Sequence, residues 1–335
     1  FLITYTNSAI LIIIFKNILF MRVLGRHGLY RRIAMRLYVE EAYVERCVLG
    51  IDGGGTKTVC VLATLDGKVT GRGSGGTTNP NLVSESEIKE TLQKAILEAI
   101  QNNPNIQIEA VCAGIAGVGA SEQKQIEVSN VIWQILSTPP LCHALSERFN
   151  PSKNVEVVSD VVIALVAGAG ERHGIVAISG TGSVVYGETI KGQKIKVGGW
   201  GCLLDEGSGY EVGRIALREI LKAYDVSGET TPLAQKVLSA WNLSSVRDVV
   251  NHIYQKTTKP TDIANLAKIV NQSANAGDEA AKDVLRKAAG DLYSNISAAA
   301  KQIDFGKEGA TLVLSGGVLT NVEIVREIIV EKIRA

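Results

Sequence analysis

The order of apolar and polar residues divides most of the chain into strand-like and helix-like segments. Short apolar runs rich in β-branched residues predict buried strands. They lie at 47–52, 58–64, 108–116, 155–158, 174–178, 184–188, 194–199 and 311–315. Apolar residues three or four positions apart predict helices at 84–101, where Ser84 and Glu87 match a capping box, and at 122–136. The chain is therefore expected to be an α/β protein.

The order of these segments indicates two domains, residues 47–154 and residues 155–335. The first reads strand, strand, strand, helix, strand, helix, and its third strand is the less apolar segment 68–76. In the second, the stretch from Gly209 to Ala289 is almost wholly helical by periodicity. Thr231-Pro232 and Lys259-Pro260 mark breaks between its helices.

Residues 1–46 do not share these patterns. Ser8 to Phe20 is an apolar run interrupted by Lys16, too short for a membrane span, and several arginines follow it. An organelle transit segment, a membrane anchor and translated sequence that is not native all fit this composition. We favour the third because the first residue is not Met and both methionines lie in the segment. Residues 1–46 are therefore expected to be a leader outside the domains.

The bulk composition is that of an ordinary globular protein. The chain has 335 residues, a net charge of +1, 46% hydrophobic residues and 21% charged residues. No basic footprint for nucleic acid is present, and no membrane association is expected. The cysteines form no CxxC pair and lie mostly in apolar runs, at Cys47, Cys60, Cys112, Cys142 and Cys202. Reduced thiols in a cytoplasmic enzyme are the expectation, and a homodimer is left open.

A glycine-rich loop follows the first strand, in VLGIDGGGTKT at 48–58. Three glycines can take positive φ and expose backbone N–H groups to an anion. The candidate nucleotide-binding residues are Asp52, Gly53, Gly54, Gly55, Thr56 and Lys57. Asp52 is also the candidate Mg²⁺ residue, binding the ion through water. A plain hairpin turn is the alternative, but the strand that follows distinguishes this loop from a Walker loop.

Two further glycine motifs stand at strand ends in the second half. GIVAISGTGSVVYGE at 174–188 repeats the strand, turn, strand pattern, with Gly180, Thr181 and Gly182 in the turn. LSGGV places Gly316 and Gly317 between a strand and a helix, where an ordinary turn is the alternative. Two similar hairpins half a chain apart suggest an internally duplicated fold, each half offering one loop to the same nucleotide.

These motifs carry a resemblance. DGGGTKT, SGTGS and LSGGV resemble the two phosphate motifs and the adenosine motif of the actin-like ATPase superfamily. Thr78-Asn79, Ser159-Asp160 and GGWGCLLDEGSG at 198–209 are similar to N-acetylglucosamine kinases of the BadF/BadG/BcrA/BcrD-type ATPase group, over about residues 47–333. The resemblance implies duplicated ribonuclease H-like domains, a helical insertion in the second, and a cleft between them.

The resemblance also implies an activity, the ATP- and Mg²⁺-dependent phosphorylation of N-acetylglucosamine to N-acetylglucosamine 6-phosphate. Asp160 would be the general base, although an acid at that position has an alternative use as a helix N-cap. Thr56, Thr181 and Ser183 would contact phosphate oxygens. The residues assigned to the sugar side are Asn79, Ser183, Gly199, Trp200, Gly201 and Asp205.

The chain departs from the family pattern at two places. Relatives usually carry a Gly between the second Leu and the Asp of the GGWG block, whereas this chain reads LLDEGSG, so the position of Asp205 depends on a shorter loop. Relatives also continue past residue 335 with another strand and helix, so a C-terminal truncation is expected. Two alternative functions were weighed. An ATPase activating a 2-hydroxyacyl-CoA dehydratase needs cluster-bridging cysteines, and a non-catalytic actin-like switch needs no sugar-side residues.

Overall fold

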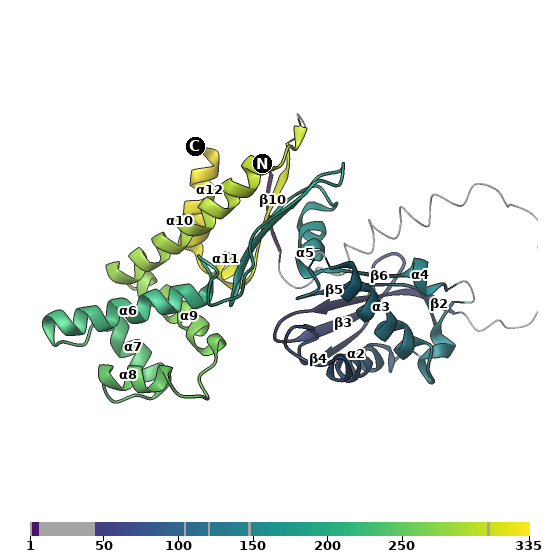
Figure 1. Cartoon of the computed structure of the whole chain (residues 1–335), viewed down its shortest axis with the longest axis horizontal. Helices are drawn as coiled ribbons and strands as arrows, with labels where there is room; N and C mark the ends of the chain where they lie inside the picture. The colour runs from purple at the N-terminus through teal and green to yellow at the C-terminus, as the bar shows by residue number, and fades with distance from the viewer. Residues whose placement is uncertain (1, 7–43, 104, 120, 147–148, 307–308) are drawn as a thin grey trace, which may run out of the picture. The chain divides into compact units, whose positions relative to one another are not determined.

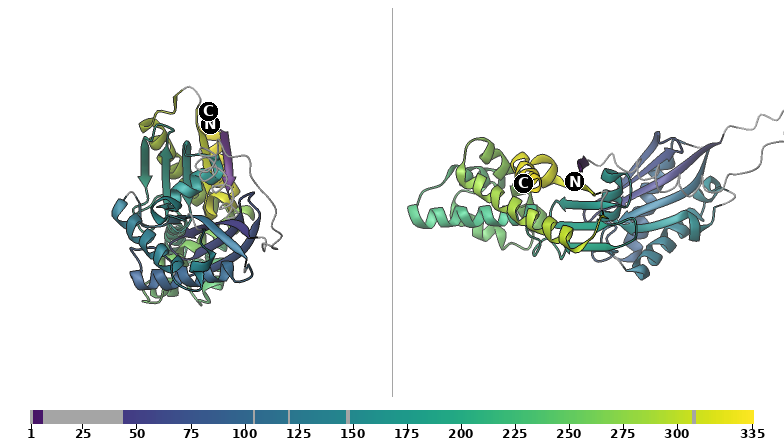
Figure 2. Two further views of the ribbon diagram at one scale, coloured as in Figure 1. Left: turned by 90° about the vertical axis from the view of Figure 1, so that its right-hand side faces the viewer. Right: turned by 90° about the horizontal axis from the view of Figure 1, so that it is seen from above.

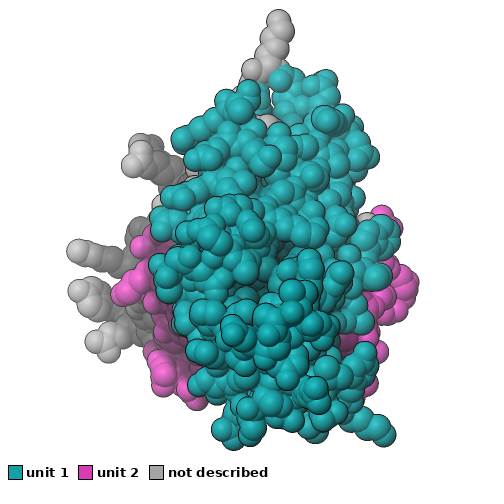
Figure 3. Space-filling model, turned by 90° about the vertical axis from the view of Figure 1, so that its left-hand side faces the viewer, with its two compact units in different colours: residues 1–7, 173–335 teal, residues 8–172 magenta. Residues whose placement is uncertain are grey.

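The computed structural model describes residues 2–6, 44–103, 105–119, 121–146, 149–306 and 309–335. The chain divides into two compact units. Unit 1 comprises residues 1–7 and 173–335, and unit 2 comprises residues 8–172, as coloured in Figure 3. Each unit contains one five-stranded sheet and its own hydrophobic core, so each is described by itself.

The sheet of unit 2 has the order β4-β3-β2-β5-β6 (Figure 1). Its strands are β2 (Glu45–Gly53), β3 (Thr58–Thr64), β4 (Val69–Gly75), β5 (Ile106–Ile115) and β6 (Val155–Ser159). β3 runs antiparallel to both of its neighbours, while β2, β5 and β6 run parallel to one another. The carboxyl ends of β2, β5 and β6 therefore lie at one edge of the sheet.

In the part of unit 2 that the structure describes, five helical segments accompany this sheet. They are α2 (Glu85–Ile100), α3 (Glu122–Leu136), the 3-10 turn η1 (Leu141–Ala144), α4 (Pro151–Asn154) and α5 (Asp160–Ala169). The predicted capping box is confirmed, because Ser84 accepts from the N–H of Glu87 and the Glu87 carboxylate accepts from the N–H of Ser84. α2 lies so close to β4 that a Cβ at Gly73 would stand 2.0 Å from the carbonyl oxygen of Ala95.

The sheet of unit 1 has the order β1-β10-β7-β8-β9. Its strands are β1 (Leu2–Thr6), β7 (Gly174–Ser179), β8 (Ser183–Glu188), β9 (Lys194–Gly198) and β10 (Thr311–Ser315). β8 is antiparallel to both neighbours, and β7, β10 and β1 are mutually parallel. Read from β9 to β1, this sheet repeats the order of strand directions found from β4 to β6.

Helices cover the sheet of unit 1 and extend beyond it. They are α6 (Gly209–Ser227), α7 (Pro232–Trp241), α8 (Val246–Ile253), α9 (Pro260–Asn275), α10 (Glu279–Gln302), α11 (Gly317–Asn321) and α12 (Glu323–Arg334). The long helix α10 contacts β7, β8 and β9 as well as α6, α9 and α12 (Figure 2). The predicted breaks are confirmed, since Pro232 and Pro260 occupy the first turns of α7 and α9. The helical region runs on from Ala289 to Gln302.

Two boundary predictions are wrong. Because β6 pairs with β5, residues 155–172 belong to unit 2, and the division falls after Arg172 rather than after Asn154. Residues 1–46 are not wholly outside the domains, because β1 pairs with β10 and β2 begins at Glu45. The apolar run Ser8 to Phe20 lies outside the described residues. Among the residues that are described, no helix combines the length and apolar character needed to cross a membrane.

The cysteines are free thiols, and three of them are core residues. Burial raises the pKa of Cys47 to about 11 and that of Cys112 to about 12, and it raises the pKa of Cys60 as well. A high pKa leaves little nucleophilic thiolate near neutral pH. These three side chains therefore act as packing residues.

Candidate functional site

The first glycine loop joins β2 to β3 at the carboxyl edge of the sheet. The N–H of Gly54 donates to the carbonyl oxygen of Lys57 over 2.9 Å, which closes the turn. Gly55, Thr56 and Lys57 are exposed. The expectation of positive φ is wrong for this loop, because none of its glycines takes one. Gly53 is required by packing instead, since a Cβ there would stand 2.2 Å from Thr78 Oγ1.

The segment after β4 lies against this loop. Thr77 Oγ1 donates to the carbonyl oxygen of Gly54 over 2.9 Å, and the buried hydroxyls of Thr78 and Thr58 are 3.0 Å apart. Asn79 Oδ1 accepts from the N–H of Asn81 over 2.9 Å, which forms an Asx turn. Asn79 is thus held beside the first glycine loop, with its side-chain oxygen facing its own backbone.

Asp160 stands where β6 passes into α5. The structure does not give it the alternative role of N-cap, because Ser159 occupies that position and Asp160 is the first residue of the helix. Asp160 Oδ1 accepts from the N–H of Val161 over 3.0 Å and from the hydroxyl of Ser159 over 3.1 Å. The N-terminal end of a helix favours a carboxylate in its ionised form. A proton acceptor is therefore compatible with this position.

Unit 2 brings Asp160 into electrostatic contact with Asp52. Burial raises the pKa of the Asp52 carboxyl above its ordinary value, the negative charge of Asp160 raises that pKa further, and the positive charge of Lys57 lowers it. The parallel strands β2 and β6 explain the pairing, because their carboxyl ends share one edge. Two carboxylates that destabilise each other's charge form a favourable site for a cation.

The oxygen donors at this edge fit Mg²⁺, which proteins often hold through one or two carboxylates and several waters. No larger metal site competes, since among the described residues no group of three or more His, Cys, Asp and Glu side chains could hold a metal ion. Asp52 is therefore the candidate Mg²⁺ ligand, with the negative charge of Asp160 close to it.

The second glycine loop joins β7 to β8 in unit 1. The N–H of Gly180 donates to the carbonyl oxygen of Gly182 over 2.9 Å. The first turn of α6 supports the loop, because the N–H groups of Gly209 and Tyr210 donate to the carbonyl oxygens of Gly180 and Thr181, over 2.8 and 3.2 Å. The N-terminal end of α6 therefore contributes to the shape of the loop.

The DEGSG segment at 205–209 is hydrogen-bonded to the residues on either side of this loop. Ser179 Oγ donates to the carbonyl oxygen of Gly207 over 2.8 Å, and Ser183 Oγ donates to that of Glu206 over 2.6 Å. Ser208 caps α6 by accepting from the N–H of Glu211 over 3.1 Å. The block that resembles the kinases most specifically thus supports the backbone of the second glycine loop.

Asp205 does not project from its loop toward a ligand. Its residue is 6% exposed, and its two oxygens accept from backbone N–H groups, Oδ2 from Ser183 over 3.2 Å and Oδ1 from Trp200 over 2.7 Å. The shorter loop closes tightly, because the N–H groups of Leu204 and Asp205 both donate to the carbonyl oxygen of Gly201. The Asp205 carboxylate, which the family resemblance assigns to the sugar, therefore points into the protein.

Trp200 has the exposure predicted for it, at 80%. Gly199 and Gly201 on either side have φ values of 70° and 117°, which L side chains rarely adopt. Leu203 and Leu204 are also exposed, so this loop presents an apolar surface. Such a surface suits the face of a sugar ring.

The third glycine motif lies against the second glycine loop. Gly316 has a φ of 88°, and a Cβ there would stand 2.4 Å from the carbonyl oxygen of Ser179. Gly317 begins α11 directly after it. Only glycine permits this approach, and unit 1 therefore brings together the two motifs predicted to bind the nucleotide.

One segment beside the first glycine loop was not anticipated. The N–H of Ala116 donates to the carbonyl oxygen of Gly53 over 2.7 Å, and Asn81 Nδ2 donates to that of Gly117 over 3.2 Å. Lys124 Nζ in turn donates to Asn81 Oδ1 over 2.5 Å. The sequence signal was the pair of glycines in AGVGA, immediately after a buried strand.

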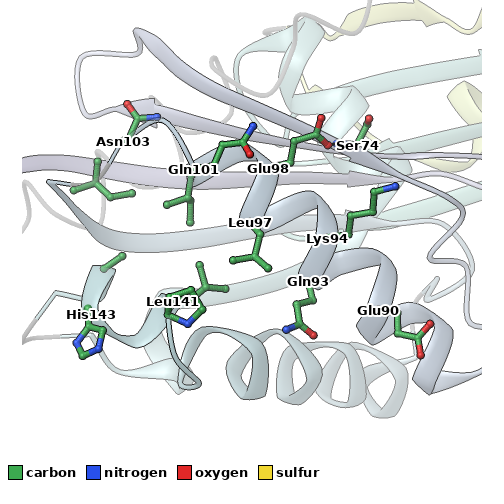
Figure 4. A pocket seen from close by; sticks show the side chains of 14 residues that line it. Ser74, Glu90, Gln93, Lys94, Leu97, Glu98, Gln101, Asn103, Leu141 and His143 are labelled. Carbon is green, nitrogen blue, oxygen red and sulfur yellow. Dashed lines mark hydrogen bonds between the residues drawn. The ribbon is translucent and has the colours of Figure 1, made fainter.

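A surface pocket of about 930 Å³ lies elsewhere in unit 2, along α2 and η1 (Figure 4). Its lining mixes apolar side chains such as Leu97 and Leu141 with polar ones such as Lys94, Glu98 and His143. None of the residues assigned from the motifs lines it. The candidate site is therefore defined by the glycine loops and their neighbours rather than by this pocket.

Glycine loops at the ends of central sheet strands, with neighbouring carboxylates that fit Mg²⁺, are the features of an ATP-dependent phosphotransferase or ATPase. Residues 49–335 match the model of the BadF/BadG/BcrA/BcrD ATPase family, and the chain belongs to this family.

Two relatives are similar to this chain over most of its length. The chain is 34% identical over 278 residues to an N-acetylmuramic acid/N-acetylglucosamine kinase of Clostridium acetobutylicum, covering 82% of this chain and 86% of the relative. It is 31% identical over 298 residues to the N-acetyl-D-glucosamine kinase of Dictyostelium discoideum, covering 85% and 89%.

A solved structure shares the fold. The crystal structure of a candidate N-acetylglucosamine kinase from Chromobacterium violaceum superimposes with a TM-score of 0.64 at 22% identity. The alignment covers 87% of this chain and 93% of that one.

Proposed function

We propose that the protein transfers the γ-phosphoryl group of ATP to the 6-hydroxyl of an amino sugar, with N-acetylglucosamine as the principal substrate. The observation that carries the proposal is that the parallel strands β2 and β6 bring Asp52, the first glycine loop and Asp160 to one edge of the sheet. The names of the two relatives support the choice of substrate.

The fold supports this proposal in its details. The two sheets, with their common order of strand directions, correspond to the duplicated halves of an actin-like ATPase. The helices α6 to α10 correspond to an insertion in the second half, since they lie between β9 and β10. Each half then carries one glycine hairpin, after β2 and after β7.

Unit 2 would supply the acid-base chemistry. Asp160 would accept the proton of the sugar hydroxyl as its oxygen attacks the γ-phosphorus, a contribution of roughly 10²–10⁴ in rate. Asp52 would hold Mg²⁺ with waters, and the bound ion neutralises phosphate charge. Thr56 and Lys57 are exposed beside it and would contact phosphate oxygens.

Unit 1 would supply nucleotide contacts and part of the sugar contacts. The backbone of Gly180, Thr181 and Gly182 would face phosphate, and that of Gly316 and Gly317 the adenosine. Ser183 would act by holding this loop in place, because its hydroxyl donates to Glu206 and its backbone N–H donates to Asp205.

The sugar side would include Asn79 of unit 2 and the exposed loop of Gly199, Trp200 and Gly201. Trp200 would pack on the sugar ring, with the flanking glycines allowing close approach. A cytoplasmic location and a homodimer remain predictions.

A coupled assay of ADP formation over a panel of sugars tests the proposal. N-acetylglucosamine, N-acetylmuramic acid, glucosamine and glucose are compared at equal concentrations, each with ATP and Mg²⁺. The highest kcat/KM is expected for an N-acetylated sugar. ADP formation that does not depend on any sugar would contradict the proposal and would favour a nucleotide switch.

A further inference from the structure

Asp205 lies where the second glycine loop meets the loop of Trp200. One carboxylate oxygen accepts from the N–H of Ser183, the first residue of β8 directly after the glycine loop, and the other from the N–H of Trp200. Gly182 presses on the same carboxylate, because a Cβ there would stand 2.7 Å from Asp205 Oδ2. A single buried side chain thus joins two loops to which different ligands are assigned.

A second hydrogen bond links the same two loops. The N–H of Gly199 donates to the carbonyl oxygen of Ser183 over 2.9 Å. Both backbone groups of Ser183 are therefore engaged, one by the Asp205 carboxylate and the other by the residue preceding Trp200. A displacement of Ser183 would be transmitted to Trp200 by both routes.

Further hydrogen bonds join the segment after Asp205 to the glycine loop and to Asp205 itself. The carbonyl oxygens of Glu206 and Gly207 accept from the hydroxyls of Ser183 and Ser179, and Ser208 Oγ donates to the carbonyl oxygen of Asp205 over 2.8 Å. These are buried or half-buried groups, so the segment and the glycine loop form one hydrogen-bonded body. Hydrogen bonds to an ionised carboxylate are about twice as strong as neutral ones.

We propose that Asp205 is a positioning residue that couples nucleotide binding at the second glycine loop to sugar binding at Trp200. The proposal rests on the proposed function, in which Trp200 belongs to the sugar site and Ser183 lies directly after the loop assigned to the nucleotide. Ordering of the second glycine loop by bound phosphate would fix Ser183 and, through Asp205, the N–H of Trp200. Sugar bound at Trp200 would fix the glycine loop in return. Coupling of this kind between two sites is reciprocal.

A direct sugar ligand at this position would behave differently. It would need an oxygen facing solvent, whereas Asp205 is almost fully buried with both oxygens accepting from backbone. Its removal would weaken sugar binding alone. Removal of a coupling residue would also weaken the nucleotide when no sugar is present.

The experiment measures the dissociation constant of Mg²⁺ with a non-hydrolysable ATP analogue by calorimetry, without and with saturating N-acetylglucosamine. The ratio of the two constants is the coupling factor, expected for the unaltered chain at about 5- to 150-fold. Asp205→Asn keeps the shape but places an amide NH₂ opposite one of the two backbone donors. Its coupling factor is expected to fall to about 1, and its analogue affinity without sugar to fall several-fold, as for a lost charge-assisted hydrogen bond.

Glu206→Gln is the matched control, because it removes the same charge one residue further on from an exposed side chain. It should keep the coupling factor of the unaltered chain. Asp205→Glu keeps two acceptor oxygens, and it should retain more coupling than Asp205→Asn. If Asp205→Asn fails to fold, the coupling factor of Asp205→Glu is compared with that of Glu206→Gln instead.

Three results would overturn the proposal: a coupling factor near 1 in the unaltered chain, equal coupling in Asp205→Asn and Glu206→Gln, or a loss confined to sugar affinity. Failure of the proposed function is recognised separately. If N-acetylglucosamine does not bind the unaltered chain, the analogue affinities decide alone: a weaker Asp205→Asn than Glu206→Gln supports a positioning role at the glycine loop, and equal affinities reject it.

Discussion

The two sheets share one order of strand directions but obtain their outermost parallel strand from different places. In unit 2 that strand is β6, which follows β5 within the same region of the chain and leads directly into Asp160. In unit 1 it is β1, residues 2–6, which come from the other end of the chain and pair with β10. In unit 2 the outermost parallel strand therefore leads to Asp160 at the candidate site. In unit 1 the corresponding strand, β1, only completes the sheet.

The strand that precedes each glycine loop shows the same contrast. In unit 2 the residue before the first glycine is Asp52, and in unit 1 it is Ser179, whose hydroxyl donates to Gly207. The residue directly before the loop is therefore a carboxylate in unit 2, while in unit 1 the loop is held by the hydroxyls of Ser179 and Ser183 and by Asp205. Unit 2 is accordingly suited to the chemical step, and unit 1 to nucleotide positioning.

The largest effect is expected at Asp160, the carboxylate that follows the outermost parallel strand of unit 2. Asp160→Asn removes the proton acceptor and keeps its shape, so kcat with N-acetylglucosamine should fall by about 10²–10⁴. Steady-state kinetics at saturating substrates measures the change. Asp66→Asn, an exposed carboxylate of the same unit, is the control and should keep its kcat. An Asp160→Asn variant with more than a tenth of normal kcat would remove Asp160 from the role of base.

The glycines of the three glycine motifs offer a matched set of stability tests. Gly53→Ala and Gly316→Ala should each lower the free energy of unfolding by about 1–3 kcal/mol, because the new Cβ would overlap Thr78 or the backbone of Ser179. Gly55→Ala and Gly180→Ala meet no atom within 4 Å and should change it by less than about 0.5 kcal/mol. Denaturant unfolding of the four variants provides the comparison, and equal losses in all four would contradict the packing described for the loops.

A third test concerns the strand of distant origin. Deleting residues 1–7 removes β1 and leaves an edge of β10 unpaired, so Tm should fall by at least about 2 °C, the shift produced by roughly 1 kcal/mol. Nucleotide affinity should fall too, because β10 leads into Gly316. An unchanged Tm after the deletion would mean that β1 contributes nothing to unit 1.

The smallest effect is expected at Asp52, and it has a definite sign. Its pKa is raised in the folded state by burial and by Asp160, so the folded state binds this proton more tightly than the unfolded state. Stability is therefore lost as pH rises from the ordinary pKa of Asp through the raised one. Asp52→Asn should remove this loss and raise Tm slightly at pH 7, while weakening Mg²⁺-dependent nucleotide binding. A lower Tm for Asp52→Asn at pH 7 would contradict this reading of the charge pair.

The elements that could be predicted from sequence are those fixed by local signals. The strand Thr311–Ser315 and the helix Glu122–Leu136 were predicted to the residue, and Ser84, Pro232 and Pro260 marked helix starts correctly. The features that the sequence did not predict depend on partners far along the chain. β1 needs β10, and Asp205 needs an N–H group 22 residues away. No local pattern encodes such pairings.

The glycines illustrate the same limit within the site itself. Their positions indicated the loops correctly, yet the reason for Gly53 is its contact with Thr78 rather than a positive φ. The boundary between the units was misplaced because β6 begins a new segment in sequence but pairs with β5 in space. Side-chain direction in a tight loop and membership of a sheet are both set by tertiary contacts.

The central claim is that the chain phosphorylates N-acetylglucosamine, and direct detection of the product tests it most plainly. The protein is incubated with ATP, Mg²⁺ and N-acetylglucosamine, and phosphorus NMR follows the products, with Asp160→Asn in a parallel sample. A 6-phosphate monoester of the sugar should form in equal amount with ADP, and the Asp160→Asn sample should show almost none. Formation of inorganic phosphate and ADP without a sugar phosphate, or equal product from both proteins, would contradict the account.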